Sequence, residues 1–327
     1  MNLSRRTILA GGLAAAAAGR SSWALAGAFD PPPVLTPGSG RFWLPGGPGR
    51  ESRPIEIVYH RPANFTPASP ILLVLPGGGR RAGLYRDTWA RHAERRGVLV
   101  AALRYPTEHY DFAAYQLGGL VKNLRVLGRP LRDDVDLPKR AKLDDADVTW
   151  EVEPRREAWI FGDFDRVFAE LVRATGSERT GYDVFGHSGG AQVAHRFAMF
   201  QPGSRAERIV AANAGLYTLP TPSAPLIYGL AGAPMDRSDL AAALKSPLTI
   251  LLGAEDNDPN HGDAHLHTPT ADRQGRARLT RGRNFFRIAR MVAQRAGLPM
   301  NWSLEVIPGV GHDHRRMARI AAERLYG

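Results

Sequence analysis

Short apolar runs separated by longer amphipathic stretches dominate the chain from residue 55 onward. Each run is four to six residues long, rich in Val, Ile or Leu, and bounded by Gly, Pro or polar residues, a pattern typical of buried strands. We therefore predict strands at residues 55–59, 71–75, 98–103, 182–185, 208–212, 248–252 and 303–307.

The amphipathic stretches predict helices at residues 85–96, 164–175, 191–200, 284–296 and 314–326. In the fourth stretch, Phe285, Ile288 and Val292 recur at helical spacing and indicate a core-facing surface. Because strands alternate with helices, the pattern predicts an α/β fold in which helices cover both faces of a mainly parallel sheet.

Three stretches depart from this alternation. Residues 129–156 are charged and contain Pro, while residues 216–246 are rich in Pro, Ala and Gly, and neither looks able to form its own core. We interpret them as a small lid or excursions from a single domain over residues 54–327. Residues 27–53 are rich in Pro and Gly and predict an irregular lead-in.

The N-terminal residues 1–26 have the pattern of an export signal. Arg5 and Arg6 precede a mild apolar run at residues 10–19, and Ala24 and Ala26 offer the small residues that a signal peptidase reads. The paired arginines predict the twin-arginine translocation machinery as a partner and a periplasmic or extracellular destination. The alternative is a membrane anchor, but the run is about half the ~20 residues that a spanning helix needs, and no later segment could span a bilayer.

Composition excludes several classes of function. The chain has no Cys, which excludes disulfides, thiolate metal sites and cysteine nucleophiles. Its formal net charge of +11 comes mostly from scattered arginines. Because no basic run with interleaved aromatics accompanies that charge, we predict no nucleic-acid partner and a solvated, Arg-rich surface.

A candidate nucleophile follows the strand predicted at residues 182–185. Gly186-His187-Ser188-Gly189-Gly190 has the pattern G-x-S-x-G between a strand and a helix, the setting in which this motif holds a nucleophilic serine on a sharp turn. The backbone N–H of Gly189 is then placed to stabilise an oxyanion. We expect His187, the variable position of the motif, to pack rather than to catalyse.

A serine nucleophile needs a base and an orienting acid, and both candidates follow predicted strands. His312 comes directly after the strand at 303–307, and Asp256 follows the strand at 248–252. The order Ser188, Asp256, His312 is that of a nucleophile-elbow hydrolase. Asp258 is the alternative acid, and Glu255 is the next candidate.

The loop after the strand at 71–75 contains three consecutive glycines, residues 77–79. Backbone N–H groups there, in particular those of Gly78 and Gly79, are expected to complete an oxyanion hole. A phosphate-binding loop is excluded because no Gly-Lys-Ser/Thr follows. Arg80 and Arg81 are either solvated or placed to meet an anionic substrate. Four residues are either cleft lining or ordinary half-buried side chains: Tyr105, His109, Tyr110 and Tyr115.

These motifs together resemble the α/β-hydrolase superfamily, particularly bacterial secreted esterases and polyhydroxyalkanoate-depolymerase-like members. The resemblance covers residues 54–327 and rests on Gly78 and Gly79 as the oxyanion loop, with Ser188, Asp256 and His312 as the triad. One departure is Pro76, which stands where lipases often have a His before the glycines.

The resulting prediction is an exported serine hydrolase that cleaves a small-molecule or polymeric carboxylic ester through an acyl-enzyme, without a cofactor. A peptidase or amidase with the same triad and a secreted binding protein on the same fold remain alternatives. A second open question is a metal, since acids and histidines cluster at residues 256–267, although that segment departs from a calcium loop. We expect a polar loop beside the triad. The clustered residues are Asp256, Asp258, His261, Asp263, His265 and His267.

Overall fold

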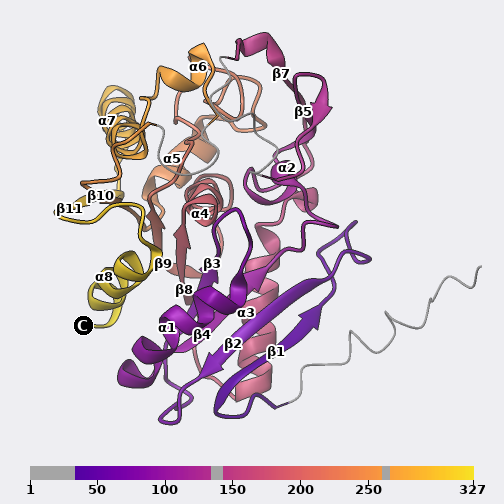
Figure 1. Cartoon of the computed structure of the whole chain (residues 1–327), viewed down its shortest axis with the longest axis vertical. Coiled ribbons are helices and arrows are strands. Elements are labelled where there is room, and N and C mark those ends of the chain that lie inside the picture. The colour runs from indigo at the N-terminus through magenta and orange to yellow at the C-terminus, as the bar shows by residue number, and fades with distance from the viewer. Residues whose placement is uncertain (1–33, 134–142, 260–265) are drawn as a thin grey trace, which may run out of the picture.

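The computed structural model describes residues 34–133, 143–259 and 266–327, and its centre is an eight-stranded sheet (Figure 1). The strand order is β1-β2-β4-β3-β8-β9-β10-β11. β2 pairs antiparallel with β1 and β4, and all other neighbours are parallel. The strands are β1 (Gly38–Leu44), β2 (Ile55–Arg61), β3 (Ile71–Leu75), β4 (Leu99–Arg104), β8 (Tyr182–His187), β9 (Ala206–Ala212), β10 (Leu248–Gly253) and β11 (Ser303–Ile307). The predicted fold class is confirmed.

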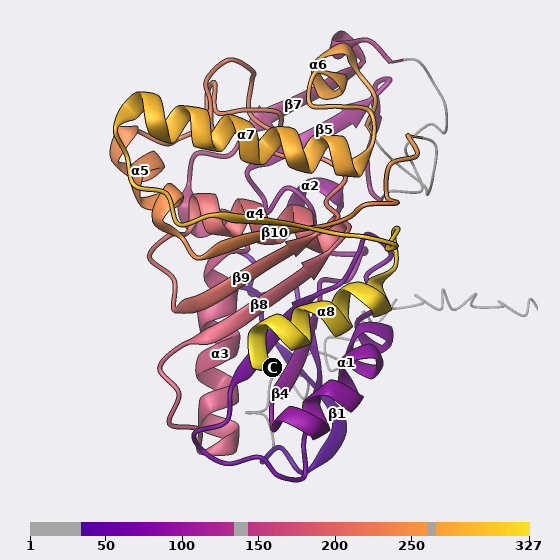
Figure 2. The ribbon, with the colours of Figure 1, turned by 90° about the vertical axis from the view of Figure 1, so that its left-hand side faces the viewer.

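Helices cover both faces of this sheet, and Figure 2 shows α1 and α8 together on one of them. The residues of β3 explain why its sequence is continuously apolar: Ile71, Leu73 and Leu75 join the core on one face, and Leu72 and Val74 join the core on the other. α1 (Ala82–Arg96) and α8 (His314–Tyr326) pack on the second of these faces. The first face carries α3 (Gly162–Thr175), α4 (Gly189–Phe200), α5 (Arg237–Lys245) and α7 (Arg278–Ala296).

A second, three-stranded antiparallel sheet lies near α6 (Pro269–Asp272) at the top of Figure 1. It consists of β5 (Val121–Val126), β6 (Arg129–Pro130) and β7 (Val148–Val152), and the short α2 (Phe112–Tyr115) precedes it. Its apolar side chains, Leu124 and Val148 among them, belong to the main core. The excursion predicted at 129–156 therefore contributes two strands to this sheet, and β5 is a strand that the sequence pattern did not predict.

The irregular lead-in predicted for residues 27–53 is wrong over β1, which forms an edge of the large sheet. Along this strand Phe42 and Leu44 are buried while Arg41 is exposed, as expected of a half-buried edge strand. A Cβ at Gly40 would lie 2.4 Å from Tyr59 Oη, so this glycine serves close packing rather than a turn. The hydrolase fold thus begins before residue 54.

The export signal predicted for residues 1–26 lies outside the described residues. Within the parts of the chain that the structure describes, none of the helices combines the length and the apolar character needed to cross a membrane.

Candidate active site

Ser188 lies on a sharp turn between β8 and α4. Its backbone has φ 57° and ψ −117°, a strained conformation for a residue with a side chain. Neighbouring glycines make the turn possible, because a Cβ at Gly190 would lie 1.9 Å from the carbonyl oxygen of Leu75 and one at Gly186 would lie 2.2 Å from the carbonyl oxygen of Gly190. The turn therefore holds a partly exposed serine at the end of β8.

His312 and Asp256 reach this serine from the ends of two further parallel strands. Nε2 of His312 lies 3.1 Å from Ser188 Oγ, and Nδ1 of His312 lies 2.8 Å from Asp256 Oδ2. Asp256 is 2% exposed and follows β10, whereas His312 follows β11. Three residues far apart in the sequence thus form one hydrogen-bonded chain from a hydroxyl through an imidazole to a buried carboxylate.

The second oxygen of Asp256 is held by an arginine that the sequence pattern did not single out. Nη1 of Arg278, the first residue of α7, lies 3.2 Å from Asp256 Oδ1, and both side chains are buried. Burial alone would raise the pKa of Asp256, but the hydrogen bond to His312 and the charges of His312 and Arg278 lower it below its ordinary value. Asp256 is therefore an anion at neutral pH.

The other acids considered for this position face solvent. Asp258 and Glu255 are exposed, and it is Asp256 that contacts His312. Of the acid–histidine cluster, residues 261, 263 and 265 lie outside the described residues. Among the residues that the structure does describe, no three His, Asp or Glu side chains form a group that could hold a metal ion.

The glycine loop approaches the nucleophile through Gly78. A Cβ at Gly189 would lie 2.7 Å from the backbone nitrogen of Gly78, so these two segments meet beside Ser188. Within the described residues, the backbone N–H groups of Gly78 and Gly189 donate to no other group. Gly79 is exposed, and Gly77 packs against Tyr85, since a Cβ at Gly77 would lie 3.0 Å from Tyr85 Oη. Gly78 and Gly189 are therefore the best-placed pair of donors.

Arg80 is neither solvated nor free to meet a substrate, so both alternatives predicted for its side chain are wrong. It is 3% exposed, and its guanidinium donates to the carbonyl oxygens of Tyr105 (2.9 Å), Tyr110 and Asp111 (3.1 Å). It also lies 4.5 Å from the ring centroid of Tyr115. Arg80 thus anchors the glycine loop.

The aromatic side chains near this arginine are structural. Tyr105, Tyr110 and Tyr115 are completely buried, and Tyr115 Oη donates to the carbonyl oxygen of Pro76 (2.6 Å). His109 is exposed. The four candidates for cleft lining therefore support the loop or face solvent instead.

His187 is buried beside the triad, as expected of a packing residue. Its ring centroid lies 4.7 Å from that of His312, and its Nδ1 lies 3.1 Å from Tyr85 Oη. Burial, followed by the neighbouring His312 and His314, lowers the pKa of His187 well below its ordinary value. His187 is therefore a neutral imidazole.

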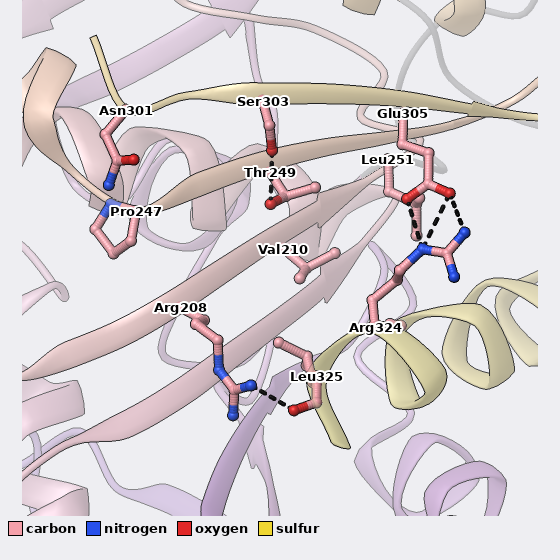
Figure 3. Close-up of a pocket in the computed structure, with 11 residues that line it drawn as sticks. Arg208, Val210, Pro247, Thr249, Leu251, Asn301, Ser303, Glu305, Arg324 and Leu325 are labelled. Atoms are coloured by element: carbon pink, nitrogen blue, oxygen red, sulfur yellow. Dashed lines mark hydrogen bonds and ion pairs between the residues drawn. The ribbon is translucent and has the colours of Figure 1, made fainter. Parts of the chain in front are cut away.

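Among the hollows on the described surface, which reach about 570 Å³, two of similar volume differ in the residues that line them. One, of about 280 Å³, is lined by Ser188, His312 and the glycine loop. The other, of about 290 Å³, lies between α8 and the sheet at β9, β10 and β11 (Figure 3). The first is the candidate active site because Ser188 and His312 line it, whereas no histidine lines the second.

A mainly parallel sheet with a serine on a strand–helix turn, and with a histidine and an acid at the ends of later strands, defines the α/β-hydrolase class. The chain belongs to the α/β-hydrolase superfamily. It is 34% identical to poly(aspartic acid) hydrolase-1 from Sphingomonas sp. KT-1, over 90% of this chain and 100% of that one, with a TM-score of 0.76.

A second solved structure, the poly(3-hydroxybutyrate) depolymerase LpqC from Bordetella parapertussis, is 29% identical over 88% of this chain and 90% of that one, with a TM-score of 0.73. An IroE-like serine hydrolase from Shewanella oneidensis, 10% identical over 88% of this chain and 80% of that one, shares the fold (TM-score 0.50). No protein-family model and no curated protein sequence matches the chain. The resemblance to depolymerase-like α/β-hydrolases is confirmed, and the chain is a hydrolase enzyme.

Proposed function

We propose that this protein is an exported serine hydrolase that cleaves carboxylic esters through an acyl-enzyme on Ser188. The observation that carries the proposal is the continuous hydrogen-bonded chain from Ser188 Oγ through His312 to Asp256. A hydroxyl is a weak nucleophile until a base takes its proton, and this arrangement supplies both the base and the group that orients it.

In the first half-reaction, His312 Nε2 takes the proton of Ser188 as Oγ attacks the ester carbonyl. The imidazolium that forms is stabilised by ionised Asp256 at Nδ1, and Arg278 keeps that carboxylate in place. His312 then gives the proton to the leaving alcohol, which departs and leaves Ser188 acylated.

The oxyanion of the tetrahedral intermediate is stabilised by the backbone N–H groups of Gly189 and Gly78, with Gly79 as a further candidate. The strained backbone at Ser188 places the N–H of Gly189 beside the glycine loop. One such donor is typically worth about 3 kcal/mol of transition-state stabilisation. In the second half-reaction, water activated by His312 attacks the acyl-enzyme and releases the acid.

Amide hydrolysis is a second candidate activity with the same triad. It is favoured by the 34% identity to a poly(aspartic acid) hydrolase, whose polymer is joined by amide bonds, whereas the 29% identity to a poly(3-hydroxybutyrate) depolymerase favours a polyester. Release of new chain ends from each polymer by the purified protein would distinguish the two substrate classes.

The triad is tested with a fluorophosphonate probe, which reacts only with an activated serine. We expect the protein from Gly27 onward to be labelled and Ser188→Ala not to be. Ser303→Ala is the matched control, because Ser303 is an exposed serine in the hollow of Figure 3. A folded wild-type protein that takes up no label would refute the serine mechanism and favour a binding protein.

Export by the twin-arginine route is part of the proposal and rests on Arg5 and Arg6. The double variant Arg5→Lys, Arg6→Lys is expected to leave the uncleaved precursor inside the cell. Equal export of this variant and the wild type would argue for another route.

A further inference from the structure

The pocket beside Ser188 has an unusual balance of charge. The side chains that line it include Arg81, Arg278, His187 and His314, and none of its lining residues is Asp or Glu. Arg278 pairs with Asp256, Arg80 donates to backbone carbonyl groups, and His312 contacts Asp256 and Ser188. The other basic side chains of the lining are Arg81, His187 and His314.

Arg81 lies at the edge of this pocket and is exposed. Its guanidinium makes no hydrogen bond or ion pair within the described residues, unlike that of its neighbour Arg80. Arg81 is also the residue before α1, a helix whose N-terminus has no side-chain cap and no acid in its first turn. The partial positive charge of that helix end adds to the charge of the arginine.

His187 contributes a buried ring nitrogen to the same pocket. Its Nδ1 lies 3.1 Å from Tyr85 Oη. Its other ring nitrogen, Nε2, has no hydrogen-bond partner among the described residues although the side chain is 3% exposed. A buried polar nitrogen without a partner calls for a partner from a ligand or water.

His314 completes the set from the start of α8. Its ring centroid lies 5.2 Å from that of Tyr85, and its Nε2 also has no partner within the described part of the chain. A guanidinium and two imidazole rings, in a pocket whose lining contains no Asp or Glu, make a site for an anion with several acceptor atoms.

We infer that this pocket binds a carboxylate of the substrate through Arg81, His187 and His314. The inference rests on the proposed function, and it assigns the enzyme to substrates that carry a free carboxylate close to the bond that is cleaved. The Arg81 guanidinium forms a charge-assisted pair with the carboxylate, and the imidazoles of His187 and His314 line the same pocket.

The first test measures binding without catalysis. Glutarate is titrated calorimetrically into Ser188→Ala protein that carries Arg81, Arg81→Gln or Arg91→Gln. Arg91 is exposed on α1, the helix that follows Arg81, and lies outside the pocket, so it controls for the loss of one positive charge. We expect Arg81→Gln to weaken binding at least ten-fold, Arg81→Lys to restore part of it, and Arg91→Gln to have no effect. Absence of binding, or equal weakening by both Gln variants, overturns the inference.

The second test locates the carboxylate in the substrate. para-Nitrophenyl glutarate is compared with para-nitrophenyl valerate for the acyl side, and para-acetoxybenzoate with para-cresyl acetate for the alcohol side. In one of these pairs the ratio of kcat/KM for the charged ester to that for the neutral ester is expected to fall at least ten-fold in Arg81→Gln. Unchanged ratios in both pairs contradict the inference. Fluorophosphonate labelling of the wild type shows separately whether the serine mechanism itself stands.

Discussion

Two hollows of nearly equal volume, about 280 Å³ beside Ser188 and about 290 Å³ between α8 and the sheet, differ in how their polar groups are paired. In the hollow of Figure 3, Glu305 pairs with Arg324, Thr249 Oγ1 lies 3.0 Å from Ser303 Oγ, and Arg208 is bound to Asp183 and to the carbonyl oxygen of Leu325. These contacts satisfy its polar groups.

The hollow beside Ser188 has the opposite character. It combines a strained serine backbone, a buried imidazole nitrogen without a partner and an arginine without an ion pair, the last two within the described residues. Such features cost stability and persist where function requires them. Pairing and strain therefore distinguish the two hollows, whereas volume does not.

The largest effect that this comparison predicts is the loss of the base. His312→Ala removes the group that we propose takes the proton of Ser188, so kcat for an ester substrate should fall by about 10⁴- to 10⁶-fold. The fold should be retained, because His312 is partly exposed. Steady-state kinetics and far-UV circular dichroism check both expectations. A variant with more than a tenth of wild-type kcat would exclude His312 as the base.

The tight turn at Ser188 should be the next most sensitive feature. Gly190→Ala places a methyl group 1.9 Å from the carbonyl oxygen of Leu75, so the turn must open or β3 must shift. We expect a loss of about 3 kcal/mol or more in the free energy of unfolding, together with loss of fluorophosphonate labelling. The control is Gly203→Ala, where the added Cβ meets nothing within 4 Å. Equal stabilities in urea unfolding would mean that the turn is not under steric constraint.

Loss of Arg278 should have a smaller effect. Arg278→Met keeps a side chain of similar length in the buried space but leaves Asp256 with His312 as its charged partner. Because Arg278 lowers the pKa of Asp256, the variant should protonate Asp256 at higher pH and lose activity earlier on acidification. We expect kcat/KM at neutral pH to fall about 10- to 100-fold, in the range reported for groups that orient a site.

The profile of kcat/KM against pH is the measurement that separates this role from packing. A role in packing alone would lower kcat/KM without moving the acid limb. A wild-type profile in Arg278→Met, with unchanged kcat/KM, would remove the arginine from the catalytic arrangement.

Sequence analysis predicted those parts of this site that depend on local sequence patterns. The strand–turn–helix around Ser188 and the strands before Asp256 and His312 follow from short apolar runs and glycines, because burial on both faces of a parallel sheet imposes them. The choice between Asp256 and Asp258 could not be made from the sequence. The two acids lie two residues apart, and what distinguishes them is the direction that the loop backbone gives to each side chain.

Other features depended on contacts across the fold. Arg278 reaches Asp256 from another helix, and Arg80 is buried because carbonyl groups of a later loop converge on it. No periodicity marks either arginine, so sequence analysis left Arg80 as either solvated or facing a substrate and did not single out Arg278. β1 was missed for a related reason: the Gly- and Pro-rich residues around it hid a short edge strand whose stability comes from pairing with β2.

The smallest predicted effect lies in the hollow of Figure 3. Arg324 and Glu305 form an ion pair whose side chains are 60% and 31% exposed, and pairs of this kind contribute about 0.2–1 kcal/mol to stability. Glu305→Gln should therefore change the free energy of unfolding by less than about 1 kcal/mol and leave kcat/KM for ester substrates within two-fold of the wild type. The matched change beside Ser188, Arg81→Gln, alters a group without an ion pair in the described chain and should act on substrate selectivity instead. A ten-fold loss of kcat/KM in Glu305→Gln would show that the two hollows are functionally coupled. The presence or absence of partners for polar side chains would then not distinguish the candidate active site from the hollow of Figure 3.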